Sequence, residues 1–358
     1  MNTNKQSLRL ERVAVETAMT VMTVKLGIDL HAADAVVSRQ DGGQLPKPAR
    51  RMEVAALEQM VRQLREAGVE VHSCYEAGPC GYGLHRRLVA LGAHNVVVVP
   101  RRWDPQGQRV KTDKRDARQL CDALDRYVRG NTTAFSVVRV PSEEQEQQRA
   151  ICRQRGMLVK ERQRAVVRGH GLMLMAGLQA PPQWWEPKVW PEWAAQLPAA
   201  LRGRVECWQQ QAVALDAQVE RWTGQVEALA RGPRPKGIGA LTAAVLGAEI
   251  LDWQRFNGRR QVASYTGLCP GEDSSGPRRR QGAVTKHGNP RVRHYLIEAI
   301  WRMLEWQPDY PPLRKLRATV GKRQRKRLAV AAARHLAIDL WRLNTHRCTA
   351  EQLGLHLG

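Results

Sequence analysis

The sequence predicts an α/β domain followed by mostly helical domains. Between Val24 and Val99, short apolar runs alternate with amphipathic stretches of helical period, a pattern typical of a sheet covered by helices. From Ser142 onward the pattern is long, helical and rich in Arg and Gln. A chain of 358 residues is also long enough for two or three domains. We therefore expect the class α/β plus α.

Each element of the α/β part is expected from its own pattern. Short apolar runs predict strands, and the last of these runs ends at Pro100, which cannot donate to a strand ladder. Apolar positions that recur every three or four residues predict helices. The expected strands are residues 24–30, 35–39, 69–75 and 95–99, and the expected helices are residues 54–67, 83–91 and 113–127.

The helical part begins with a recognisable helix start. Ser142 is a candidate N-cap and Gln145 follows three residues later, which is the spacing of a capping box. The helical pattern runs to about residue 175, stops at an irregular insert rich in Pro and Trp, and resumes over about 199–230, so we expect antiparallel helices or a coiled-coil arm. A Gly- and Pro-rich segment at 232–239 marks the next boundary. The expected division is a leader at 1–22, then domains at 23–140, 141–231 and 232–358.

Charge and cysteine usage narrow the class of partner and compartment. Lys and Arg number 57 against 34 Asp and Glu, a formal net charge of +23, so a polyanion is the expected partner. The sequence has no lipidation signal and no uninterrupted apolar span of about 18 residues, so a membrane is not expected. The 7 cysteines form no CxxC pair, which argues against a zinc ribbon and for reduced thiols in a cytoplasm.

Four carboxylates are the most informative residues. Asp29 and Glu76 end apolar runs that are predicted strands, and Asp113 and Asp116 share one face at the start of a predicted helix. Each one alone could be an ordinary strand-end acid or a solvated helix acid. Together, and in this order, they match a ribonuclease H-like nuclease, in which two divalent ions about 4 Å apart act on a phosphodiester.

Candidate phosphate contacts lie in three places. Basic residues flank the paired acids, gather in a Gly/Ser-rich loop at 267–288 and recur over 314–327, although each group could instead be a solvated face. The Gly237-Ile238-Gly239 turn resembles a helix-hairpin-helix element that could bind a phosphate, or is a tight turn without a ligand. The expected nucleic-acid contacts are Lys111, Lys114, Arg115, Arg278, Arg279, Arg280, Lys286, Arg291 and Arg293.

The Gly/Ser-rich loop also carries two adjacent serines, Ser274 and Ser275. A serine hydroxyl is a weak nucleophile, but phosphate-clamping arginines and a metal could activate it toward a phosphodiester. The simpler interpretation is a basic loop that touches phosphates and does no chemistry. The residues alone leave both interpretations open.

These motifs together resemble a known family, the DEDD transposases of the one-ten and eleven-eleven group of insertion sequences, which are bridge-RNA-guided recombinases. The resemblance extends from Val24 to about residue 343. Its first part consists of Gly-Ile-Asp, Tyr-Glu-Ala-Gly and Lys-Thr-Asp-x-x-Asp-Ala, which contain the four acids. Its second part consists of Gly-Leu-x-Pro at 267–270, Ser-Gly at 275–276, Arg-x-Gly at 280–282 and Thr-Lys-x-Gly-Asn at 285–289.

The resemblance implies a RuvC-like N-terminal domain, a helical arm and a C-terminal transposase domain. It implies that the four acids bind Mg²⁺ and that the serine directly before Gly276, which is Ser275 with Ser274 in reserve, forms a covalent link to DNA. The implied partners are donor DNA, target DNA and a structured noncoding bridge RNA. A homodimer or homotetramer is implied, because the acidic site of one subunit acts with the serine of another. The implied setting is a bacterial cytoplasm, at the nucleoid when DNA is bound.

Two other functions fit parts of the pattern. A RuvC-like junction nuclease would use water as the nucleophile, so Ser275 would be a mere contact and no protein–DNA adduct would form. A non-catalytic nucleic-acid-binding protein would bind in the presence of a chelator and cut no strand. The presence of all four acids argues against this last function.

Overall fold

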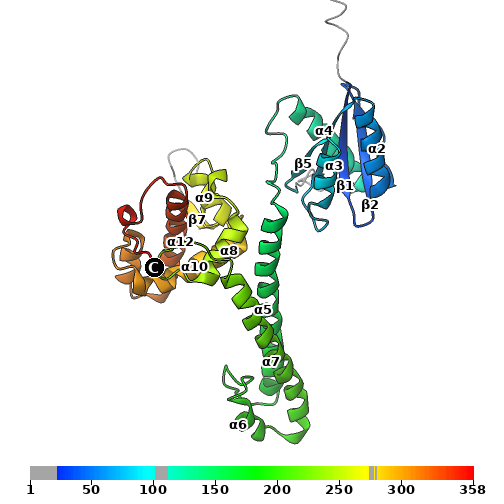
Figure 1. Cartoon of the computed structure of the whole chain (residues 1–358). Coiled ribbons are helices and arrows are strands. Elements are labelled where there is room, and N and C mark those ends of the chain that lie inside the picture. The colour runs from blue at the N-terminus through cyan, green and yellow to red at the C-terminus, as the bar shows by residue number, and fades with distance from the viewer. Residues whose placement is uncertain (1–21, 101–111, 274–277, 279) are drawn as a thin grey trace, which may run out of the picture. The chain divides into compact units, whose positions relative to one another are not determined.

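The computed structural model describes residues 22–100, 112–273, 278 and 280–358 (Figure 1). Apart from Met22, the expected leader lies outside the described residues. The chain divides into two compact units, and the boundary in the sequence falls between Val140 and Pro141. Each unit has hydrophobic cores of its own, so each can be understood from its own part of the sequence.

A five-stranded mixed sheet forms the centre of the first unit (Figure 1). Its strands are β1 Thr23–Leu30, β2 Asp34–Asp41, β3 Arg50–Glu53, β4 Glu70–Glu76 and β5 His94–Val98, in the spatial order β3-β2-β1-β4-β5. The pairs β1–β2 and β2–β3 are antiparallel, whereas β1, β4 and β5 run parallel. Parallel strands are typically buried on both faces, and the central strand β1 is buried continuously from Val24 to Ile28. The sequence did not predict β3, because its Arg-Arg-Met-Glu sequence contains no apolar run.

In the described part of this unit, three helices cover the two faces of the sheet. They are α2 Val54–Glu66, α3 Gly83–Ala90 and α4 Asp113–Val128. On one face, Leu57 of α2 and Leu88 of α3 share a core with Leu26 of β1. On the other face, Leu120 of α4 packs with Cys74 of β4. Because successive strand residues point to opposite faces, the odd-numbered residues of β1 and the even-numbered residues of β4 lie on the α4 side.

Gly27 lets α4 lie directly against β1. A Cβ atom at Gly27 would lie 2.3 Å from the carbonyl oxygen of Ala117 and 2.3 Å from the backbone nitrogen of Cys121. Helix backbone cannot rotate aside as a side chain can, so Gly27→Ala must push α4 away from the sheet. We expect a loss of about 1–3 kcal/mol in the free energy of unfolding, measured by urea titration. Gly43→Ala is the matched control, since a Cβ there meets only a side-chain nitrogen at 3.7 Å; equal midpoints for both variants would contradict this packing.

Two long helices begin the second unit. They are α5 Glu143–Met175 and α7 Ala199–Glu227, which pack along each other (Figure 1). Ser142 Oγ accepts a hydrogen bond from the Gln145 backbone nitrogen at 3.1 Å, and Gln145 Oε1 accepts one from the Ser142 backbone nitrogen at 3.1 Å. The predicted capping box is therefore present, and it fixes the start of α5.

The insert rich in Pro and Trp is more ordered than its sequence indicates. It contains the short helix α6 Trp190–Ala195 and packs against the ends of α5 and α7. Trp184 is fully buried, and a Cβ atom at Gly169 would lie 2.3 Å from its ring. Met173 and Val205 belong to the same core. The expectation of an irregular segment was therefore incomplete, because local patterns do not show that a tryptophan will be enclosed by distant helices.

Shorter helices complete the second unit around one large core. They are α8 Ala240–Ile250, α9 Arg259–Thr266, α10 Pro290–Trp306, α11 Arg314–Arg317 and α12 Lys322–Asn344, with 3-10 turns at Trp253–Arg255, Pro311–Leu313 and Glu351–Leu353. The segment expected as a loop contains a two-stranded hairpin of β6 Pro270–Glu272 and β7 Gln281–Val284. The predicted class, a sheet with helices followed by helices, is confirmed. Within the described ranges, no helix has the length and hydropathy needed to span a bilayer.

Candidate metal centre

Asp29 and Glu76 end neighbouring strands of the sheet. Strands β1 and β4 are parallel and their register pairs Ile28 with Tyr75, so the two acids leave the sheet side by side. Strand alternation places both acids on the α4 side: Asp29 shares the face of Gly27, which contacts α4. The sequence alone predicted this convergence from the two strand ends.

Asp113 and Asp116 occupy the first turn of α4, which approaches the same strand ends. The residue before the helix, Thr112, is extended and makes no side-chain cap. Unpaired backbone N–H groups and the helix dipole favour carboxylates at this position. Ala117 and Leu120 continue the same side of α4 and are buried against the sheet, so helix packing fixes where the two acids lie.

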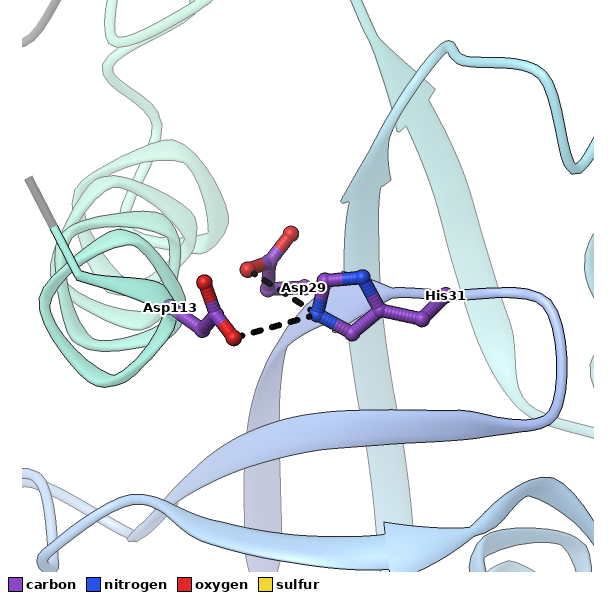
Figure 2. A group of neighbouring side chains, drawn as sticks. All are labelled: Asp29, His31 and Asp113. Carbon is purple, nitrogen blue, oxygen red and sulfur yellow. Dashed lines mark ion pairs between the residues drawn. The ribbon is translucent and has the colours of Figure 1, made fainter.

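The imidazole of His31 faces two of the acids, as Figure 2 shows. Its Nε2 is 3.6 Å from Asp29 Oδ2 and 3.4 Å from Asp113 Oδ2. One ligand atom from each of these three residues lies within 4.8 Å of the others. The Nε2 atom is buried and makes no hydrogen bond within the described structure. This nitrogen lies within ion-pair distance of two carboxylates but makes a hydrogen bond to neither. Together the three groups form a donor set that fits a divalent cation.

Negative charge is in excess at this site. Burial raises the pKa of Asp29, and the nearby His31 opposes that rise. The charges of the other three acids, Asp113, Asp116 and Glu76, raise the pKa of Asp29 further. A raised pKa means that the folded protein disfavours the ionised carboxylate. A bound cation would remove this cost, so the electrostatics also fit a metal.

Arg51 of β3 contacts the outer side of the centre. Its Nη2 donates to Asp113 Oδ2 at 2.8 Å, and its Nη1 donates to Asp34 Oδ1 at 2.9 Å. Neither Arg51 nor His31 was predicted as a site residue. His31 had a signal in the sequence, since it stands two residues after Asp29, but Arg51 had none, because β3 itself was not predicted.

Comparison with protein-family models and with known proteins shows the family of this chain. Residues 26–176 match the IS110-type DEDD model, described as a transposase, and residues 234–313 match the model described as Transposase IS116/IS110/IS902 family. A Sinorhizobium fredii protein named as transposase y4rJ is 32% identical over 302 residues, which are 75% of this chain and 75% of that relative. The chain belongs to the IS110 family of DEDD transposases.

Further relatives agree with this family. Transposase y4qE, named in the same Sinorhizobium fredii strain, is 32% identical over 285 residues, which are 76% of this chain and 66% of that relative. The transposase for insertion sequence element IS1111A of Coxiella burnetii is 26% identical over 302 residues, which are 77% of this chain and 80% of that relative. The first family match begins in β1 and continues through α4, so it includes all four predicted acids.

The remaining predicted residues of this transposase lie mostly in its second unit. Arg278, Arg280 and Lys286 are exposed in or beside the β6–β7 hairpin. The Asp273 backbone nitrogen donates to the Arg280 carbonyl at 2.9 Å, so these two residues pair across the hairpin. Four predicted residues lie outside the described part of the chain: Lys111, Ser274, Ser275 and Arg279. The predicted contacts of α4, Lys114 and Arg115, are exposed.

Two of the predicted basic residues have partners inside the protein. Arg293 Nη1 donates to the carbonyls of Thr266 at 3.1 Å and Lys286 at 3.3 Å. The Arg291 Nε lies 3.9 Å from an oxygen of Glu249. These bonds give Arg293 a structural role in fixing the segment after the hairpin. Contact of either arginine with nucleic acid stays a prediction.

The carboxylate of Glu249 in α8 joins three helices. The sequence predicted no role for this residue. Its side chain is 1% exposed, and Arg153 of α5 donates to both of its oxygens, at 3.0 and 3.1 Å. Asn289, the N-cap of α10, donates to Glu249 at 2.9 Å and accepts from two backbone N–H groups of α10. Burial alone would raise the pKa of Glu249, but the bonds from Arg153 and Asn289 outweigh it and lower that pKa.

The turn before α8 was interpreted from the sequence either as a phosphate-binding element or as a tight turn without a ligand, and its geometry favours the tight turn. Gly237 has a φ of 92°, and a Cβ atom there would lie 2.9 Å from Cα of Met303 in α10. The positive φ requires glycine for backbone conformation, and the close approach to α10 requires it for packing. They support a tight interhelical turn and do not call for a phosphate.

Proposed function

We propose that this transposase is an RNA-guided recombinase that cuts and rejoins donor and target DNA through a covalent phosphoserine intermediate. The observation that carries the proposal is the convergence of Asp29, Glu76, Asp113 and Asp116 at one end of the sheet. A mixed sheet with acids at two strand ends and on a covering helix also favours a RuvC-like first domain. The resemblance at Ser275 and Gly276 supplies the second half of the proposal, the nucleophile.

The four acids are the residues that would hold Mg²⁺. When bound, the ion would supply Lewis-acid stabilisation of charge on the phosphate undergoing attack. The protein orients the acids through the parallel strand register, the packing of α4 and the bond from Arg51 to Asp113. Lys114 and Arg115 are exposed beside these acids and would bind neighbouring phosphates.

The proposed reaction conserves the phosphodiester in two transfers. In the first, the Ser275 hydroxyl oxygen forms a bond to phosphorus and loses its proton, while the bond from phosphorus to one deoxyribose oxygen breaks and that oxygen gains a proton. In the second, a deoxyribose hydroxyl of the other DNA attacks the phosphoserine and loses its proton, and the serine oxygen leaves and regains one. Arg278, Arg279 and Arg280 would balance the phosphate charge beside the serine.

The proposed partners follow from charge and from the resemblance. A net charge of +23 suits the backbones of donor DNA, target DNA and a structured bridge RNA, with sequence selected mainly by base pairing. Arg323 and Arg327 line an open groove of the second unit and would add backbone contacts. We propose a homodimer or homotetramer, paired through the α5–α7 arm, in which one subunit's acids act with another's serine.

A covalent adduct tests this function directly. The full chain is mixed with RNA transcribed from the noncoding flanks of its element, labelled donor and target DNA, and Mg²⁺, and the products are separated on a denaturing protein gel. We expect DNA label to stay with the protein, to disappear in Ser275→Ala and to persist in the matched Ser274→Ala. Cleaved DNA without an adduct, unchanged in Ser275→Ala, would contradict the serine mechanism and leave a RuvC-like nuclease that uses water.

A further inference from the structure

The imidazole of His31 is a group of the first unit whose environment the four acids do not explain. Its Nε2 is excluded from solvent and makes no hydrogen bond in the described structure, although it faces Asp29 and Asp113. An unsatisfied buried nitrogen costs folding free energy, so the arrangement needs an explanation. The four predicted acids do not supply one, because they account for the carboxylates alone.

The backbone places His31 where it is. It follows the last residue of β1, and its backbone nitrogen donates to the Asp34 carbonyl at 2.9 Å, which closes the turn from β1 to β2. The ring is therefore presented by a short, hydrogen-bonded turn rather than by a long loop. A side chain held in this way can serve as a fixed ligand.

The distances favour a shared cation over a direct bond. A charged N–H···O⁻ hydrogen bond has a length of about 2.7–2.9 Å, shorter than the 3.4 and 3.6 Å from His31 Nε2 to the two acids. Neighbouring ligand atoms of one cation are farther apart, about 3.0 Å in an octahedral site and about 3.3 Å in a tetrahedral one. The distances from His31 Nε2 to the two carboxylates are close to this separation between ligand atoms, and a slight rotation of either side chain would match it.

We propose that His31 is a nitrogen ligand of the divalent cation at this centre, and that it makes the site selective for a transition metal such as Mn²⁺ over Mg²⁺. The inference rests on the proposed metal site and names a residue beyond its four acids. Imidazole binds transition metals well, whereas Mg²⁺ prefers oxygen ligands and keeps its waters. The site would therefore bind either ion but hold Mn²⁺ more tightly.

The test is the magnetic coupling of bound Mn²⁺ to nitrogen. The full chain is loaded with Mn²⁺, its affinity is measured by the loss of the free-ion electron paramagnetic resonance signal, and ¹⁴N coupling is recorded by pulsed methods. We expect ¹⁴N coupling in the unmodified protein and its loss in His31→Gln, with Mn²⁺ affinity at least about tenfold lower and Mg²⁺ affinity little changed. His170→Gln, on α5 of the other unit, is the matched control and should retain both properties.

The outcomes separate this inference from the metal site on which it rests. Mn²⁺ binding that is lost in Asp29→Asn but shows no ¹⁴N coupling would overturn the role of His31 and leave the carboxylate site intact. Mn²⁺ binding that Asp29→Asn does not weaken would overturn both. Coupling that disappears in His31→Gln and persists in His170→Gln would support the inference, whether or not recombination has been observed.

Discussion

Replacing Asp29 with asparagine is expected to slow strand cleavage by at least about a thousandfold. The pKa of Asp29 responds to each of the other three acids, so it is central to the charge of the site. Its carboxylate is also one of the two that face His31 Nε2. If Asp29 holds the metal as proposed, its loss removes several kcal/mol of transition-state stabilisation, and about 4 kcal/mol corresponds to about a thousandfold in rate. The measurement is a single-turnover time course with labelled donor DNA, Mg²⁺ and RNA transcribed from the noncoding flanks of the element.

Asp122 provides the matched control on the same helix. It is an exposed acid of α4 and, at 100° per residue, lies on the side of the helix opposite Asp113. We expect Asp122→Asn to cleave at nearly the rate of the unmodified protein. Equal rates for Asp29→Asn and Asp122→Asn would show that the acidic centre is not where cleavage occurs.

A stability measurement separates lost chemistry from lost folding. The pKa of Asp29 is raised above its ordinary value of 3.8, so the folded protein binds this proton more tightly than the unfolded chain does. The resulting stabilisation is present at low pH and is lost as the pH rises through the raised pKa. At neutral pH the ionised carboxylate therefore destabilises the metal-free fold. Asp29→Asn should accordingly unfold at the same temperature as the unmodified protein, or at a higher one.

The sequence was sufficient to predict that the four acids converge, because backbone geometry places them; that they bind a metal stays a prediction. Asp29 and Glu76 end apolar runs, and parallel strands bring their ends to one edge of a sheet. Asp113 and Asp116 begin a helix whose buried stripe faces that sheet. Each of these patterns is local, either a strand run that ends in an acid or a helix with one buried stripe, and the structure contains all of them.

The residues that the sequence did not reveal act through contacts without a local pattern. Arg51 belongs to an edge strand of mostly polar sequence and meets Asp113 only after the sheet has formed. Trp184 is enclosed through a close approach at Gly169, which no periodicity indicates. Glu249 is a lone acid in an apolar helix, and its partners come from distant parts of the chain. Long-range pairing of this kind needs coordinates.

Removing the carboxylate of Glu249 is expected to have the largest effect on stability. Breaking a buried ion pair typically costs about 3–5 kcal/mol, because the remaining charge is left without compensation. We expect Glu249→Ala to fall near the lower end of that range, since Arg153 is itself 43% exposed and water can solvate it. Asn289 would also lose one of the two acceptors of its side-chain amide and keep only the Tyr265 hydroxyl, which weakens the N-cap of α10. Urea unfolding at neutral pH measures the loss, and Glu298→Ala, an exposed acid of α10, is the control.

The pH dependence of the free energy of unfolding shows whether Glu249 stabilises the protein through its charge or through packing alone. Because the pKa of Glu249 is lowered from its ordinary value of 4.5, the unfolded chain binds the proton more tightly than the folded protein does. The stabilisation by the ionised carboxylate is therefore complete above that ordinary value, and it is lost as the pH falls through the lowered pKa. Glu249→Gln keeps the shape of the side chain but removes this dependence, so its deficit relative to the unmodified protein should shrink as the solution is acidified. A deficit that stays constant from neutral to acidic pH would mean that packing, and not the charge facing Arg153, determines the contribution of Glu249.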